Sequence, residues 1–588
     1  MGAIDRVFRG RRGGQERPIA AIVAGLWKNG EQGLWYDPSD LSTMYQDATG
    51  TTPVYMPGQG QIDPPVGLLL DKRKGLARGP ERLTNGSFSA GAAGWNVTGA
   101  DATHIATFAD GKVRYQSDTT SPALTLSQAA AGLVPDSYYE ILITLSSWVS
   151  GSLKTDSLHP MGTAIGLQFT FSGVGTYRFV GKAIASNFGI LRAVTNVDLT
   201  IDSISIKQLS GNHAFQPSTP SRPALTCRYN LLTNTNWSGA VVGAPGTAPT
   251  GWSANFSTAA ITGVSQLGND YAIQLTASAQ RLFFAQAFSA AANTTYSLSC
   301  LVVENAGVPI EQMLGFTGVP AGATLQWYVN GVASTNGIFP VTGARIELRL
   351  INGSTAGTPA ARVGIGCAVN ATGVVGLAQP DVRVTSDGIG LPPYQRIVDA
   401  NTYDTAGFPL YLRFDGVDDW MQTAPVDFST ADKLFATAAL RKLSDSLAGI
   451  VVELSAVSNT SNGSFALLAP AGSNDTLAVY MRGATALTTS VPSGIPSPTS
   501  RVFTGVMDLS AAVGKQSQSR VNGARYAYAS QDAGGGNFGV YPLYIGRRGG
   551  TGLPLNGRIY GLVIRSNFAS EAQLAAVERY LNQKARIY

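Results

Sequence analysis

A long run of short strand signals in the last part of the chain restricts its fold more than any other feature. The run begins at 412–420 (LRFDGVDDW), closes at 555–564 (LNGRIYGLVI) and contains almost only such signals between these points. Asn-Gly pairs at 522–523 and 556–557 favour tight type I′ turns between antiparallel strands. The pattern predicts two stacked antiparallel sheets.

One clear helix signal follows these strands. Ser570 and Gln573 have the spacing of a capping box. Leu574, Val577 and Leu581 then recur at helical spacing, which gives the helix one apolar face. Together with the strand signals, this pattern predicts an all-β chain of tandem antiparallel β-sandwiches with one C-terminal helix.

Two earlier blocks repeat one another. The opening 83–88 (LTNGSF) is followed by Gly94 and Trp95, and the opening 229–237 (YNLLTNTNW) is followed by Gly251 and Trp252. Each block ends in an alternating strand, which places one of its faces in a core. The sequence therefore predicts two diverged copies of one sandwich module in tandem.

Two details of these blocks are specific enough to check. The closing strand of the first block, 197–206, slips out of alternation at Asp202 and Ser203, which predicts a β-bulge. Trp95, Trp237 and Trp252 stand where the sandwich cores begin, and we interpret them as core residues, with sugar stacking as the alternative.

Linkers rich in proline and glycine separate the blocks, at about 211–226 and 388–394. They predict four regions: an irregular N-terminal region at 1–80, the two sandwich modules at 81–210 and 225–388, and a C-terminal jelly roll at 396–588.

Charge, cysteine content and hydropathy exclude several classes of protein. The 588 residues carry a net charge of only +5, so we expect no nucleic-acid partner. Three cysteines, Cys227, Cys300 and Cys367, do not make a disulfide framework, which favours folding in a reducing cytoplasm. The apolar run at 18–27 is about half the roughly 20 residues that cross a bilayer, so we expect no membrane insertion.

The first 80 residues differ from the rest of the chain. They contain an arginine cluster, several prolines and turn chemistry around scattered hydrophobic residues, which is too little to close a core alone. We expect this region to dock onto something else. The arginine cluster is either a solvated tail or a contact with a partner subunit. The residues we assign to anchoring are Arg9, Arg11, Arg12, Trp27, Trp35 and Tyr36.

No catalytic motif is visible. His104, His159 and His213 lie in three unrelated contexts, and neither a nucleophile elbow nor a phosphate loop is present. The densest acidic group is 415–419, which we interpret as a turn built by aspartate side chains. A calcium or ligand contact and a catalytic role stay open as alternatives.

Other residues are candidates for binding. Asp198 and Asp202 are weak candidates for a structural calcium ion, and we expect no other cofactor. Loops at one end of a sandwich are where binding residues gather, and surface Arg and Tyr are favoured at interfaces. This makes four residues of the last region candidates for ligand binding, with subunit contact or solvation as the alternative: Tyr480, Arg482, Arg547 and Arg548. Trp420, beside the acidic turn, is a fifth candidate, with packing in the core as its alternative.

Several stretches resemble known families. The openings "NGSFSAGAAGW" and "NLLTNTNW…GTAPTGW" resemble carbohydrate-binding-module-like β-sandwiches, and "LRFDGVDDWMQT", "LYIGRRGG" and "LNGRIYGLVI" resemble concanavalin-A-like, laminin-G-type jelly rolls. The N-terminal "LWYDPSDLSTMYQDATGTTPV" with "PVGLLLDKRKGL" resembles the leader of virion proteins of tailed bacteriophages.

The resemblance implies a non-enzymatic virion protein, assembled in the host cytoplasm. Residues 1–80 would contact other virion proteins, and the remainder would bind the host surface, most simply a glycan, as part of a tail tip or fibre. Weak sites gain from several copies, so we expect a homo-oligomer, most simply a trimer. A purely structural capsid or collar decoration and a glycan depolymerase are the alternatives.

Overall fold

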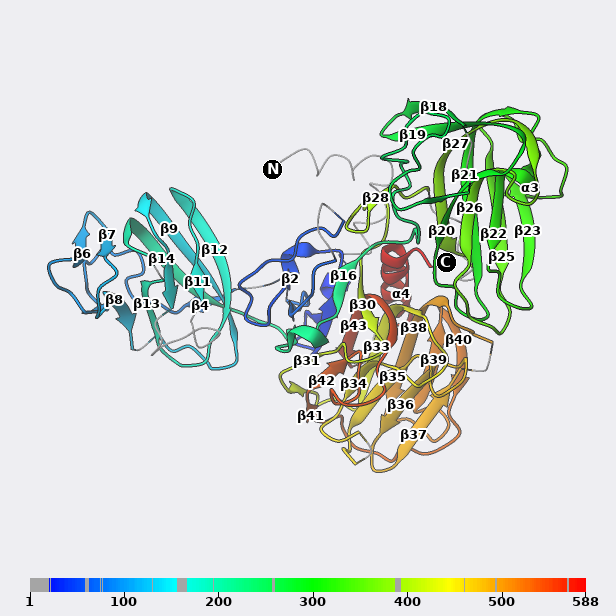
Figure 1. Ribbon diagram of the computed structural model, residues 1–588. Coiled ribbons are helices and arrows are strands. Elements are labelled where there is room, and N and C mark those ends of the chain that lie inside the picture. The colour runs from blue at the N-terminus through cyan, green and yellow to red at the C-terminus, as the bar shows by residue number, and fades with distance from the viewer. Residues whose placement is uncertain are drawn as a thin grey trace.

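The computed structural model describes most of the chain from residue 21 onward. The described residues are 21, 23–58, 63–74, 76, 78–129, 131–155, 167–193, 195–255, 260–385, 393–458, 460–491, 494–567 and 570–587. They form three two-layered antiparallel β-sandwiches (Figure 1), which confirms the all-β fold class. Within these ranges no helix is both long and apolar enough to cross a bilayer.

The first sandwich forms the lobe at the left of Figure 1. Its core packs around residues such as Phe88, Trp95 and Tyr139. Its larger sheet contains, in spatial order, β12 (Gly175–Lys182), β9 (Tyr138–Ser150), β14 (Val197–Leu209), β7 (Lys112–Ser117) and β6 (His104–Ala109), with β4 (Arg78–Glu81) beside β14. Its smaller sheet contains β11 (Gln168–Phe169), β10 (Leu153–Thr155), β13 (Phe188–Arg192), β8 (Thr125–Gln128) and β5 (Asn96–Thr98).

The second sandwich forms the green lobe at the upper right of Figure 1. Its larger sheet contains β18 (Ala260–Leu267), β19 (Asp270–Gln280), β27 (Ala371–Val384), β21 (Thr295–Ala306), β25 (Arg345–Ile351), β23 (Thr324–Val329) and β24 (Val332–Ser334). Its smaller sheet contains β17 (Ser253–Ala254), β20 (Leu282–Ala287), β26 (Ala360–Ile365) and β22 (Leu314–Thr317), preceded by the one-turn helix α3 (Ile310–Met313).

The two sandwiches repeat one another in atomic detail. The indole Nε1 of Trp95 donates a hydrogen bond of 3.1 Å to the carbonyl of Asn85, and Nε1 of Trp252 donates one of 3.0 Å to the carbonyl of Asn234. Both asparagines adopt the left-handed conformation, with φ of 53° and 50°. The three module tryptophans are buried, and the register of β14 shifts at Ile201 and Ser203, so the predictions of core tryptophans and of a bulge are confirmed.

The third sandwich, the C-terminal sandwich, lies at the bottom of Figure 1. Its first sheet contains β16 (Ala224–Thr226), β30 (Tyr411–Asp415), β43 (Asn556–Ser566), β33 (Lys433–Lys442), β38 (Thr499–Asp508), β39 (Ser517–Val521) and β40 (Ala524–Tyr528), with β1 (Gly33–Tyr36) also on β43. Its second sheet contains β2 (Met44–Tyr45), β3 (Leu68–Leu69), β15 (Ala214–Phe215), β31 (Met421–Thr423), β42 (Leu543–Ile545), β34 (Ile450–Leu454), β35 (Ser464–Leu468), β36 (Ala478–Arg482) and β37 (Ala486–Ser490).

Short pieces complete the described structure. Two separate two-stranded sheets pair β28 (Ile397–Asp399) with β29 (Thr402–Tyr403), as a hairpin, and β32 (Val426–Asp427) with the distant β41 (Val540–Tyr541). Single 3₁₀ turns lie at Gly25–Trp27, Leu41–Thr43 and Thr219–Ser221.

The described part of residues 1–80, the leader, is built into the C-terminal sandwich and is not a unit of its own. Strand β30 pairs with the first half of β43, and β1 pairs with its second half, from Leu562 to Arg565. Strands β2 and β3 extend the second sheet. This corrects the expectation that residues 1–80 form a region separate from the jelly roll at 396–588, because β1 is buried at all four positions and needs partners on both faces.

Both earlier sandwiches are therefore insertions into the C-terminal one. The first lies between β3 and β15, and the second lies between β16 and β30, while these four strands all belong to the C-terminal sheets. Leu34 and Tyr36 face the core of the C-terminal sandwich, together with Phe414 and Ile564.

Helix α4 (Glu571–Ala585) covers the outer face of the first C-terminal sheet. The side chain of Ser570 accepts a hydrogen bond from the Gln573 N–H, and Oε1 of Gln573 accepts one from the Ser570 N–H, so the predicted capping box is confirmed. Leu574 and Leu581 pack with Trp35 of β1 in one buried cluster. The helix thus closes the leader onto the sheet.

Candidate functional site

A row of side chains crosses the outer face of the second C-terminal sheet. Alternation along each strand turns Met421, Ile545 and Phe465 into the core and their neighbours outward. The outward residues are aligned by the strand registers from β31 to β36, and we call them the outer row: Gln422, Tyr544, Glu453, Ala466 and Tyr480.

Trp420 extends this row at one end. It directly precedes β31, is half-buried, and its ring centroid lies 6.0 Å from that of Tyr544 with a tilt of 40°. The β42–β43 loop lies against the indole, because a Cβ built on Gly550 would be 2.8 Å from the Trp420 ring. With φ of +70°, position 550 is also one that glycine accepts without strain. The loop therefore fixes the orientation of the indole.

Two arginines of the same loop take up different roles. Nε of Arg548 donates a hydrogen bond of 2.8 Å to Oε2 of Glu453, and the Ser455 hydroxyl donates one of 2.7 Å to Oε1. Burial raises the pKa of Tyr544, and the Glu453 carboxylate adds to this effect. Arg547 is half-buried and donates from Nη2 to the carbonyl of Thr551 at 3.3 Å.

The other two candidate residues lie on β36, at the far end of the row. The Tyr480 hydroxyl donates a hydrogen bond of 3.2 Å to the carbonyl of Ser458, and Nε of Arg482 donates one of 3.2 Å to Oδ1 of Asn462. Both side chains are half-buried, and they lie on the same strand face because they are two residues apart.

The structure thus brings Trp420, Tyr480, Arg482 and the Arg547–Arg548 loop to one face of one sheet. Sequence reasoning missed Gln422, Glu453 and Tyr544, which connect them. Tyr544 had a detectable signal, because it alternates with the apolar Leu543 and Ile545. Glu453 had none, since its strand is buried at every position.

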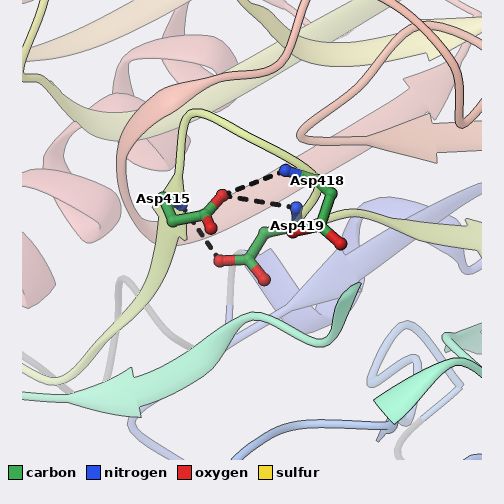
Figure 2. A group of neighbouring side chains, drawn as sticks. All are labelled: Asp415, Asp418 and Asp419. Carbon is green, nitrogen blue, oxygen red and sulfur yellow. Dashed lines mark hydrogen bonds between the residues drawn. The ribbon is translucent and has the colours of Figure 1, made fainter. Parts of the chain in front are cut away.

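The acidic group at the β30–β31 turn is organised by its own backbone (Figure 2). Oδ1 of Asp415 accepts hydrogen bonds from the N–H groups of Val417, Asp418 and Asp419, and Oδ2 of Asp419 accepts one from the Asp415 N–H. The Ser221 hydroxyl donates to Oδ2 of Asp418 at 2.9 Å. This confirms the prediction of a turn built by aspartate side chains.

The three carboxylates also crowd one another. One oxygen from each of Asp415, Asp418 and Asp419 lies within 4.8 Å of the others, a spacing that could hold a cation. Burial, together with the neighbouring Asp415, raises the pKa of Asp419 to about 7. The turn therefore concentrates negative charge beside Trp420.

The two weak calcium candidates are each paired with a base. Asp198 accepts two hydrogen bonds from Arg114, of 3.1 and 2.9 Å, and Nζ of Lys112 lies 3.3 Å from Oδ1 of Asp202. Asp202 is the residue that the register of β14 skips between Ile201 and Ser203, and Asp198 lies four residues before it on the same strand. Arg114 and Lys112 therefore balance the negative charge of these two carboxylates.

The residues assigned to anchoring fall into two groups. Arg9, Arg11 and Arg12 lie outside the described residues. Trp27, Trp35 and Tyr36 are buried, and the Tyr36 hydroxyl donates to the carbonyl of Asn212. This corrects the expectation that these three side chains themselves face a partner, because they pack the leader onto the C-terminal sandwich.

No family model matches the chain, and a search of curated proteins gives no match. Among solved structures, a CBM40 module of the Ruminococcus gnavus IT-sialidase bound to α2,3-sialyllactose is 19% identical with a TM-score of 0.21, over 25% of this chain and 83% of that one. The CBM22-1–CBM22-2 tandem of Paenibacillus barcinonensis Xyn10C is 12% identical with a TM-score of 0.19, over 53% and 98%. The ANXUR2 extracellular domain of Arabidopsis thaliana is 8% identical with a TM-score of 0.16, over 49% and 87%. TM-scores of this size carry no inference about function.

Proposed function

We propose that this chain is a non-enzymatic component of a bacteriophage particle that binds a glycan of the host surface through the outer row and Trp420. The observation that supports it is the grouping of half-buried Trp420, Tyr544 and Tyr480 with polar Gln422 and Arg548 on one rigid sheet face. Aromatic rings with a few placed polar groups are the usual composition of a site that binds small ligands or single sugars.

The place in a particle is supported by the leader sequence, which resembles virion leaders. Glycan binding by one such face is weak, and several copies raise it through effective concentration. The proposal therefore includes a homotrimer at a tail tip or fibre. Sedimentation or light scattering of the purified chain tests that copy number.

The glycan site is tested by adsorption of the purified chain to host cells. Trp420→Ala and Tyr544→Ala remove ring area from the site without opening the core, so each should weaken binding by about tenfold. Tyr526→Ala is the matched control, because Tyr526 is 53% exposed on the edge strand β40 of the other sheet. Equal binding by all variants would contradict the site.

A depolymerase has one observation in its favour, the raised pKa of Asp419 beside two further carboxylates. A retaining glycosidase needs two free carboxyl groups about 5 Å apart. Here the Asp415 oxygen that faces the turn is occupied by three backbone donors. Release of oligosaccharides from host polysaccharide by wild type, and its loss in Asp419→Asn, would establish the enzyme instead.

A further inference from the structure

A cavity of about 520 Å³ opens within the leader, where the segment that contains Trp27 meets the segment that contains Lys72. Its volume falls in the range of about 300–1,000 Å³ that is usual for ligand pockets. None of the described residues that line the cavity belongs to the outer row, since they lie between Ala24 and Asp40 and at 72–74 and 76.

The walls of this cavity are held rigidly. Trp35 belongs to β1, which is hydrogen-bonded to β43 along its whole length. Its ring meets that of Tyr580 of α4 edge to face, with centroids 5.6 Å apart, and stacks on Trp27 at 6.4 Å. A ligand would therefore meet a preformed surface and would lose little free energy in ordering it.

The charge that lines the cavity is mainly positive. Lys28, Lys72, Arg73 and Lys74 contribute four basic groups, and Asp40 contributes one acidic group. Asp40 is already occupied, since its Oδ2 lies 2.7 Å from Nζ of Lys72. An anionic ligand is the charge class that fits this lining.

Two of the four basic groups remain available. Nε of Arg73 lies 3.0 Å from Oδ2 of Asp71, so this guanidinium is paired. Lys28 and Lys74 are exposed, and within the part of the chain that the structure describes their ammonium groups have no ion-pair or hydrogen-bond partner. These two lysines are the free contacts for an incoming carboxylate.

The aromatic lining distinguishes between two kinds of anion. Trp27 and Trp35 are only 8% and 7% exposed, and Nζ of Lys72 lies 5.0 Å from the centroid of the Trp35 ring. Neither indole presents an open face on which a sugar ring could stack. Flexible acidic side chains, whose methylene groups pack against ring edges, fit this lining better than an acidic sugar does.

We propose that this cavity binds an acidic peptide segment of another protein of the particle. Carboxylates of the segment pair with Lys28 and Lys74, and its side-chain stems pack on the apolar lining. This rests on the particle role proposed above and adds the chemistry of the partner. It also replaces direct contact through Trp27 and Trp35 with contact through the cavity that they line.

The test uses the full chain and a fluorescein-labelled oligoglutamate peptide, with binding followed by fluorescence anisotropy at low ionic strength. Lys28→Glu with Lys74→Glu should weaken binding by at least about tenfold, as the loss of two ion pairs predicts. Lys154→Glu with Lys515→Glu is the matched control, because it makes the same change in net charge elsewhere and should bind like wild type.

A second variant distinguishes binding of the peptide inside the cavity from binding to a charged surface. Ala24→Trp fills the cavity and leaves every lysine in place, so it too should weaken binding about tenfold. Wild-type affinity in Ala24→Trp, equal losses in the control pair, or no binding of oligoglutamate by wild type would each overturn the proposal. Tighter lysine-dependent binding of oligogalacturonate than of oligoglutamate would overturn it in favour of an acidic glycan.

Failure of the proposed acidic-peptide site is distinguishable from failure of the proposed glycan site. The cavity variants leave the outer row untouched and should keep wild-type adsorption to host cells, whereas Trp420→Ala should keep wild-type binding of oligoglutamate. A melting temperature equal to that of wild type verifies that each variant is folded.

Discussion

The backbone N–H of Asp71 donates a hydrogen bond of 2.9 Å to Nδ1 of His213. Nε2 of the same imidazole donates to the carbonyl of Leu209 at 3.2 Å, so the ring is held as the neutral tautomer with both nitrogens used. Both side chains are buried. This contact joins the leader to the point where the chain leaves the first sandwich.

Lowering the pH should weaken this contact between Asp71 and His213. Burial lowers the pKa of His213 to about 4, and Arg73 contributes in the same direction. Between pH 6.5 and 4 the unfolded chain binds a proton that the folded chain does not, so the free energy of unfolding should fall by about 3 kcal/mol at most as pH drops through this window. Denaturant titrations across it, compared with His213→Gln, measure the effect. The same slope in the variant would contradict it.

The β30–β31 turn should respond to pH in the opposite direction. The pKa of Asp419 is about 7 in the folded protein, so the folded state keeps a proton that the unfolded state releases above about pH 4. The contribution of this group is therefore lost as pH rises from about 4 to 7. Asp419→Asn should raise the free energy of unfolding at pH 8 by about 1–3 kcal/mol. A loss of stability at pH 8 would show that the charged form is the favoured one.

Removing the Trp35 ring should destabilise the C-terminal sandwich. The ring fills the space between β43 and α4, and Trp35→Ala should cost about 3–5 kcal/mol through the cavity it leaves. Faster amide exchange in β43 and α4, with unchanged exchange in β14, is the expected readout. Val149→Ala, at a position 66% exposed, is the control. Unchanged amide exchange in β43 would contradict the view that the leader stabilises the C-terminal sandwich.

The repeat of the sandwich module predicts that equivalent substitutions lower the stability of each sandwich independently. Gln128 accepts from the Thr84 N–H at 3.0 Å and donates to its carbonyl at 2.7 Å, and Gln286 makes the same pair with Thr233 at 2.6 and 3.1 Å. Gln128→Ala should lower the stability of the first sandwich by about 1–3 kcal/mol, because two backbone groups lose their partner. Gln286→Ala should do the same to the second sandwich.

Calorimetry separates the two effects if each sandwich melts by itself. The transition of the first sandwich should move in Gln128→Ala and that of the second in Gln286→Ala, with the other transition fixed. Movement of both transitions in either variant would show that the sandwiches unfold as one unit and would contradict their independence.

Local patterns were sufficient for most of the fold. The turn at Asn522 and Gly523, the slip at Asp202 and the capping box at Ser570 each act within a few residues, so their outcomes are readable from sequence. The predicted turn at Asn556 and Gly557 is wrong, because these residues begin β43 and pair with β30. The role of β1 is different. Its four residues carry no signal for a partner near residue 563, and pairing at such separation depends on the completed sheet.

The candidate site likewise contains residues that the sequence could indicate and residues whose position depends on long-range strand pairing. Trp420 and the Arg547–Arg548 loop could be proposed as binding residues from the sequence, because loops and surface aromatic residues carry their own signal, and their role in binding stays a prediction. That Glu453 lies under Arg548 depends on the order of β42, β34 and β35 in the sheet, which follows from long-range pairing. The burial of Trp27 and Trp35 could not be foreseen either, since α4 covers them from the opposite end of the sequence.

Insertion of two modules between strands of one sandwich has a consequence during synthesis on the ribosome. Gln32 and its partner Ser566 are 534 residues apart, so β1 stays without its neighbour until the segment around Ser566 has emerged. Both inserted modules can fold long before then. Translation that stops after the second module would yield two folded modules flanked by strands of the C-terminal sandwich that lack their pairing partners. Such unpaired strands make the product prone to aggregation and degradation.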